Sequence, residues 1–168
     1  GIVEYLRPRV KDAEEVVALG QAFHRVDRGD LEGLQAAVAG GVSVNAVWTD
    51  GRGLLVEACW SIQEALATWL LDQGADVDVV DWRGRTALMG AAHIGLTEVA
   101  ERILAVSKAT LDAQDKNGYT ALWWTARWGR VGAVRVLLAA GADKSIADKN
   151  GRTPLDVADD EEVKALLR

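Results

Sequence analysis

Residues 84–92 read GRTALMGAA, and the same phrase returns with variations at 51–59 (GRGLLVEAC), 118–126 (GYTALWWTA) and 151–159 (GRTPLDVAD). The glycines that open the four phrases are spaced 33, 34 and 33 residues apart. A fixed period of this length is typical of a stack of one repeated supersecondary unit. The fold of the chain therefore has to be read from a single unit.

Each unit is predicted to contain two short helices. In the unit that begins at Asp81, Gly84 permits a positive φ in a turn, and the hydroxyl of Thr86 can cap the helix that follows. Gly95 can end that helix in a left-handed conformation. The apolar residues at helical spacing are Leu88, Ala91 and Ala92 in the first helix, and Val99, Ile103 and Leu104 in the second. One pair of helices cannot bury both apolar sides alone, so the units must stack.

The GRTAL and GRTPL phrases resemble the ankyrin repeat family, as do GADVDVVD at 74–81 and GADKSIAD at 141–148. The resemblance covers nearly the whole chain, from Leu19 to Leu167. It implies an all-α solenoid of stacked helix-turn-helix units with projecting β-turns, a fold used mainly for protein binding. We expect one domain over 1–168, made of an arm (1–11), an N-terminal capping repeat (12–47), internal repeats (48–80, 81–114 and 115–147) and a C-terminal cap (148–168).

Several positions depart from the family pattern. Gly53 and Leu54 stand where the family has Thr-Pro, which removes a helix cap worth about 1 kcal/mol. Ile62 stands where the other units have a helix-ending glycine, and 107–111 carries one additional residue. The first internal repeat is therefore expected to be the least regular. Asp12 and Glu15 form a predicted capping box at the start of the first helix.

The composition limits the kinds of partner and location that can be expected. A formal net charge of −6 opposes bulk attraction to nucleic acid, whose affinity comes mainly from phosphate neutralisation. No apolar run approaches 18 residues and no signal-peptide pattern is visible, so we expect no membrane partner and a cytoplasmic location. Cys59 is the single cysteine and is expected to be a buried, inert thiol. The chain is expected to be monomeric on its own.

No catalytic, metal or cofactor site is predicted. His24 and His93 are the two histidines, and neither stands at a recognisable spacing from a nucleophile. The sequence contains no phosphate-binding GxxxxGK[ST] pattern and no nucleophile elbow. The recurrent aspartates belong to the turns of the repeat. We therefore predict a protein that is not an enzyme.

Seven tryptophans in 168 residues are far above ordinary usage. By resemblance, Trp60, Trp124 and Trp128 line the concave groove, and we predict a pocket walled by these three rings. We expect Gly90 at the floor of this pocket because it stands at the position equivalent to Trp124. The predicted surroundings are Glu57 at one edge, His93 at the rim and Ile94 at the position equivalent to Trp128.

The other tryptophans are assigned by their place in the repeat. Trp69 is expected in the core, and Trp82 lies at the tip of a turn. Trp123 stands where the family has a histidine, and bracing of the next repeat and partner binding are equal alternatives for it. The direction of Trp48, at the start of a turn, is left open.

The turn tips carry a basic and aromatic row. Its members are Arg52, Trp82, Arg83, Arg85, Lys116, Tyr119, Lys149 and Arg152. Arginine and tryptophan are enriched at the energetic centres of protein interfaces. We therefore predict a protein partner that presents an acidic strip. The predicted contact set consists of this row together with Glu57, Trp60, His93, Ile94, Trp123, Trp124, Arg127 and Trp128.

Three functional readings follow. We favour a non-enzymatic protein-binding module, in a sharper version an inhibitor or immunity-type protein, and the Ala-, Gly-, Arg- and Val-rich composition suggests a bacterial source. The second reading is recognition of a small molecule, a carbohydrate or a modified residue in an aromatic pocket. The third is binding of single-stranded nucleic acid by stacking, which the net charge opposes.

Overall fold

The computed structural model describes residues 13–168 of the chain. The arm expected at 1–11 and the capping role expected of Asp12 lie outside the described residues. The helices are α2 (Ala13–Arg28), α3 (Leu31–Ala39), α4 (Leu54–Trp60), α5 (Glu64–Asp72), α6 (Ala87–Ile94), α7 (Thr97–Val106), α8 (Ala121–Arg127), α9 (Val131–Ala140), α10 (Pro154–Val157) and α11 (Glu161–Leu167). The predicted all-α repeat architecture is confirmed.

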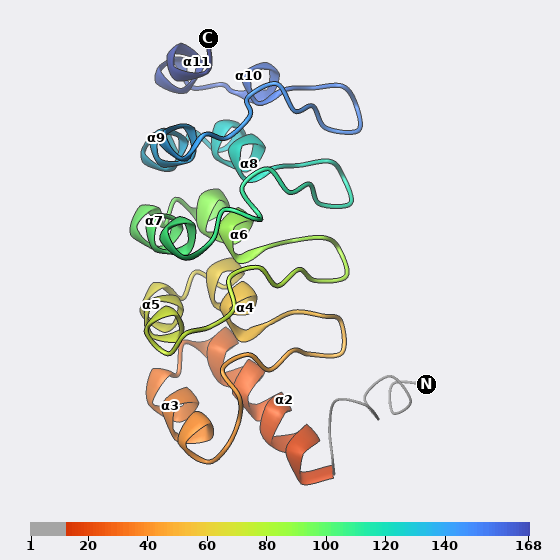
Figure 1. Ribbon diagram of the computed structural model, residues 1–168, viewed down its shortest axis with the longest axis vertical. Helices are drawn as coiled ribbons and strands as arrows, with labels where there is room; N and C mark the ends of the chain where they lie inside the picture. Colours follow the sequence, from red (N-terminus) through yellow and green to blue (C-terminus); the bar gives the residue numbers. More distant parts are fainter. Residues whose placement is uncertain (1–12) are drawn as a thin grey trace.

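The helices stack in two columns, as Figure 1 shows. The first helix of each pair stands beside the projecting turns, and the second helix stands on the far side. Successive first helices contact one another from α2 to α10, and successive second helices do so from α5 to α11. The turns follow one another along the same edge of the stack, which places their tips beside the first helices.

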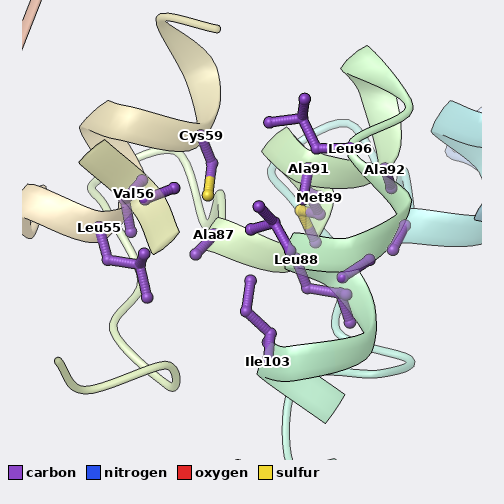
Figure 2. Close-up of a cluster of buried hydrophobic side chains, with 14 of the residues drawn as sticks. Leu55, Val56, Cys59, Ala87, Leu88, Met89, Ala91, Ala92, Leu96 and Ile103 are labelled. Carbon is purple, nitrogen blue, oxygen red and sulfur yellow. The ribbon is translucent and has the colours of Figure 1, made fainter. Parts of the chain in front are cut away.

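The core lies between the columns and continues from unit to unit. Figure 2 shows Leu55 and Cys59 of α4 facing side chains of α6, with Ile103 of α7 packed below them. Leu88 and Met89 of α6 have no exposed surface. Burial also raises the pKa of the Cys59 thiol to about 12, so this group is protonated and unreactive at neutral pH, as the sequence predicts.

Threonine hydroxyls begin the first helices as predicted. Thr86 accepts a hydrogen bond from the N–H of Met89, and Thr120 accepts one from the N–H of Trp123, both at 3.1 Å. Thr153 forms a full capping box with Asp156 in front of Pro154. Gly53 offers no side-chain cap to α4, as expected.

A buried carboxylate closes each regular turn. Asp81 accepts hydrogen bonds from the N–H groups of Arg83 and Arg85, both at 2.8 Å. Asp148 makes the equivalent bonds to Asn150 and Arg152 at 2.8 and 3.0 Å. Because the carboxylate satisfies two N–H groups at once, the tip keeps one conformation without belonging to a sheet.

Successive turns are joined by backbone hydrogen bonds. The N–H of Trp82 donates to the carbonyl of Asp50, that of Lys116 to Arg83, and that of Lys149 to Asn117, at 2.8 to 3.0 Å. A Cβ at Gly118 would lie 2.9 Å from the backbone nitrogen of Lys149, and the φ of Gly118 is +83°. This glycine is therefore required both for the turn itself and for the approach of the next turn.

The first internal repeat departs from the others where the sequence predicts it. Ile62 has a φ of 63°, the single positive φ outside glycine among the described residues, and its side chain is 62% exposed. It takes the left-handed position after α4 that Gly95 takes after α6. A β-branched residue is strained in this conformation.

We predict that Ile62→Gly stabilises the protein by about 1 kcal/mol, because it removes this strain at a side chain with little buried surface. Urea unfolding followed by far-UV circular dichroism measures the change. Ile62→Ala is the matched control, since it removes the side chain but keeps a Cβ. A loss of stability in Ile62→Gly relative to Ile62→Ala would contradict the prediction.

Candidate functional site

Four side chains on the first helices or directly after them form one aromatic cluster, which we call the indole cluster: Trp60, His93, Trp124 and Trp128. His93 stacks on Trp60 with ring centroids 5.6 Å apart and an interplanar angle of 24°. It meets the edges of Trp124 and Trp128 at 4.9 and 5.4 Å. The stack of α4, α6 and α8 brings these rings together, because the same helix face recurs in each unit.

The structure corrects the predicted pocket in two respects. A Cβ at Gly90 would lie 2.9 Å from Cδ1 of Trp60, so the indole of Trp60 covers this glycine and fills the expected recess. The Nε1–H of Trp60 donates to the carbonyl of Thr86 at 3.1 Å, which holds the ring there. His93, expected at the rim, lies at the centre of the cluster. Gly90 is therefore a packing position for an indole and not a binding floor.

The cluster is open to solvent on one side. Trp128 is 52% exposed, whereas Trp60 and Trp124 are half-buried. Nδ1 of His93 and Nε1 of Trp124 are buried without a hydrogen-bond partner among the described residues. Half-buried Ile94 stands next to the cluster at the end of α6. The exposed indole of Trp128 is thus the part of the cluster that a partner can reach first.

Two more tryptophans turn inward. Trp123 is 5% exposed and stacks on the half-buried Tyr119 at 3.8 Å, so of its two alternatives the structure favours bracing. This position removes Trp123 from the predicted contact surface. Trp48, whose direction the sequence leaves open, points toward α2 and packs on Phe23 with ring centroids 5.6 Å apart. Both rings reach a neighbouring unit, Trp48 through Phe23 and Trp123 through Arg152, whose guanidinium lies 5.9 Å from the Trp123 ring centroid.

Aspartates of the same turns neutralise several of the basic residues at the turn tips. Arg85 pairs with Asp81 at 2.7 Å, and Arg152 pairs with Asp148 at 2.8 Å. Arg52 pairs with Asp50 at 2.8 Å. These arginines close their own turns, so the predicted row is interrupted and does not form a continuous cationic strip.

Two further charged residues of the predicted set are also paired. Glu57 is 8% exposed and forms an ion pair with Arg52, which removes it from the edge of any open pocket. Arg127 pairs with Asp159 at 2.7 Å, and its guanidinium lies 5.8 Å from the ring of Trp128. Glu57 is therefore part of the scaffold, whereas Arg127 stays at the border of the indole cluster.

Three cations at the tips have no carboxylate partner within residues 13–168: Arg83, Lys116 and Lys149. The guanidinium of Arg83 lies 4.7 Å from the ring centroid of Trp82, and Nζ of Lys116 lies 4.8 Å from it. Trp82 is 51% exposed. Two unpaired cations thus share one exposed indole on adjacent turns, which concentrates positive charge at this point of an acidic protein.

A hollow of about 360 Å³ lies between these tips and the first helices. Its lining consists of Trp60, Trp82, Arg83, Arg85, Asp115, Lys116, Asn117 and Trp124. Asp115 and Asn117 are absent from the predicted contact set because their type and spacing are those of an ordinary turn. One signal was available in the sequence. Tyr119 stands where the neighbouring turns have Arg85 and Arg152, so no arginine of its own turn covers the Asp115 carboxylate.

Two other kinds of feature are absent from the described part of the chain. No group of three or more His, Cys, Asp or Glu side chains that could hold a metal ion occurs between residues 13 and 168. Over the same range, no helix has the length and apolar character needed to cross a membrane. The indole cluster and the neighbouring hollow form the candidate site because they join exposed indoles to unpaired cations.

We predict that acidification destabilises the protein through His93. Burial, and secondarily the charge of Arg130, lowers the pKa of His93 below its ordinary value of 6.5. Below pH 6.5 the unfolded chain then binds more protons at this residue than the folded chain, so the free energy of unfolding falls as pH falls through this window.

Two measurements check the prediction. NMR titration of the His93 ring should give a pKa below 6.5, and His93→Gln should reduce the loss of stability between pH 7 and pH 5. His24→Gln, which replaces the other histidine in the same way, is the matched control. A ring pKa of His93 at or above 6.5 would contradict the prediction.

The chain matches a family model for ankyrin repeats in three copies over residues 54–148 and 88–168. B-cell lymphoma 3 protein homolog from Mus musculus is 32% identical over 137 residues, which is 80% of this chain and 30% of that protein. SH3 and multiple ankyrin repeat domains protein 2 from Homo sapiens is 29% identical over 127 residues, 76% of this chain and 7% of that protein. Calmodulin-binding transcription activator 3 from Arabidopsis thaliana is 34% identical over 107 residues, 58% of this chain and 10% of that protein.

The chain spans less than a third of the length of these three relatives. The common part is the repeat array, a fold that generally serves as a non-enzymatic scaffold for protein–protein interaction. The two family matches cover more than half of the chain, and the stacked helix pairs agree with them. The chain therefore belongs to the ankyrin repeat family.

Proposed function

We propose that this chain is a non-enzymatic module that binds a protein partner with the face formed by the indole cluster and the tips at residues 81–85 and 115–119. The observation that carries the proposal is the position of Trp82 and Trp128. Both are about half exposed, and they are the two aromatic residues among the exposed large apolar side chains of the described part of the chain. Tryptophan and arginine are among the residues most enriched at the energetic centres of protein interfaces, and unpaired Arg83 lies beside Trp82.

The local charge supports the same conclusion. Arg83 and Lys116 lack carboxylate partners among the described residues, so their charges remain available for a partner. We expect the contacted surface of the partner to be acidic opposite these tips. Association should then slow as the salt concentration rises, because screening weakens the attraction between exposed charges.

The proposal predicts that Trp128→Ala weakens partner binding by at least tenfold, because the variant removes an exposed aromatic anchor. Stability should change by no more than about 1 to 2 kcal/mol, since half of this side chain is already in solvent. Affinity capture from the source organism with the wild type and with the variant measures the difference in binding.

Val106→Ala is the matched control for this experiment. Val106 is 69% exposed at the end of α7, a second helix, and lies away from the turn tips. Capture should be unchanged in this variant. Equal capture of the same proteins by wild type and Trp128→Ala would remove the indole cluster from the interface.

We further propose that the bound protein is an enzyme or toxin whose active surface is covered by this module, in the manner of an inhibitor or immunity protein, in the cytoplasm. A rigid stack with exposed anchors suits occlusion, because binding requires little ordering of the surface. Titration of the captured protein with this chain tests the point. Loss of its activity at one equivalent supports inhibition, and unchanged activity of the saturated complex contradicts it.

A further inference from the structure

We infer that the hollow between the tips at 81–85 and 115–119 receives a single carboxylate side chain, Asp or Glu, flanked by an apolar residue of the partner protein. This inference deepens the proposed function and depends on it, because it takes the same face as the binding surface. It assigns the chemistry of one contact and its place.

The charges at the hollow select a single anionic group. Arg83, Arg85 and Lys116 line it as cations, and Asp115 lines it as a carboxylate. Arg85 is already neutralised by Asp81 at 2.7 Å. Three cations and two carboxylates leave one uncompensated positive charge, which one carboxylate neutralises and a cationic ligand would increase.

The position of that positive charge is defined by Trp82. Arg83 and Lys116 lie on adjacent turns, within 4.8 Å of the Trp82 ring centroid, and the backbone hydrogen bond from Lys116 to the carbonyl of Arg83 fixes their spacing. A carboxylate that enters the hollow would accept a charge-assisted hydrogen bond from a cation at this ring. The two turns therefore hold both cations at one indole before the ligand arrives.

The rest of the lining is aromatic. Trp60 and Trp124 meet edge to face at 5.6 Å and form the inner wall of the hollow beside Trp82. The volume of about 360 Å³ accommodates an acidic side chain together with an adjacent apolar side chain. The indoles would cover the apolar part, and this burial adds affinity that the charge alone would not supply.

The same features disfavour the other ligand classes. A methylated lysine would place a cation among Arg83, Arg85 and Lys116. A nucleic acid would bring several phosphates to a chain of net charge −6, with the Asp115 carboxylate in the wall of the hollow. A single carboxylate on an apolar segment matches both the local charge and the aromatic wall.

NMR titration with defined probes tests the inference. The indole Nε1–H signals of the protein are recorded while acetyl-Phe-Glu-Phe-amide is added, with acetyl-Phe-Gln-Phe-amide as the isosteric neutral probe. The Glu peptide should shift the Trp82 and Trp60 signals saturably, and the Gln peptide should bind about tenfold more weakly. The double variant R83Q/K116Q should remove that difference between the two peptides.

K149Q is the matched control, because Lys149 is also an unpaired tip lysine but does not line the hollow. It should keep the wild-type preference for the Glu peptide. Equal binding of the two peptides to the wild type, no saturable shift at all, or equal losses in K149Q and R83Q/K116Q would each overturn the inference. Tighter binding of a deoxythymidine tetranucleotide than of the Glu peptide would overturn it in favour of nucleic acid.

The result is separable from the proposed function. Capture that depends on Trp128, combined with peptides that do not distinguish Glu from Gln, defeats the carboxylate site and leaves the protein-binding face intact. Capture that does not depend on Trp128, combined with a Glu preference that R83Q/K116Q removes, defeats the indole cluster as the protein-binding surface and leaves the carboxylate site intact. Each experiment therefore judges its own proposal.

Discussion

The buried turn aspartate is the interaction on which both the stack and its surface depend. Asp81 and Asp148 each satisfy two backbone N–H groups and one arginine, with no exposed side-chain surface of their own. Turns of constant shape can then hydrogen-bond to one another along the edge of the stack. Without this regularity the first helices would not keep the spacing that brings Trp60, His93 and Trp124 into contact.

The same aspartates determine which basic side chains stay unpaired and can contact a partner. An arginine four residues after a turn aspartate forms an ion pair with that aspartate. Arg83 stands two residues after Asp81 and donates only its backbone N–H to the carboxylate. The turn at 115–119 has Tyr119 in the arginine position, and its ring stacks on Trp123. The charged surface of the solenoid is therefore a by-product of how each turn is closed, modified by one aromatic substitution.

Aromatic residues serve two purposes in this chain, and sequence position separates them only partly. Trp48 and Trp123 brace the stack, Trp60 covers Gly90, and Trp82 and Trp128 remain half exposed. The helix face of each tryptophan follows from the repeat register. How deeply each ring is buried depends on the side chains that the neighbouring units place against it, and these vary from one unit to the next.

The repeat architecture, the threonine caps, the irregular first internal repeat and the grouping of Trp60, Trp124 and Trp128 were all predictable from the sequence, because each follows from contacts at a fixed spacing along the chain. The filling of the recess at Gly90, the central place of His93 and the place of Asn117 in the hollow were not predictable, and the one signal for Asp115 was Tyr119 in the arginine position of its turn. These features depend on side-chain rotamers and on ion pairs between units. Several alternative partners have similar energies, so the preferred one is defined only once the neighbouring units are packed in place. The periodic sequence determined the stack by itself, whereas tertiary packing decided which rings and charges the stack leaves for a partner.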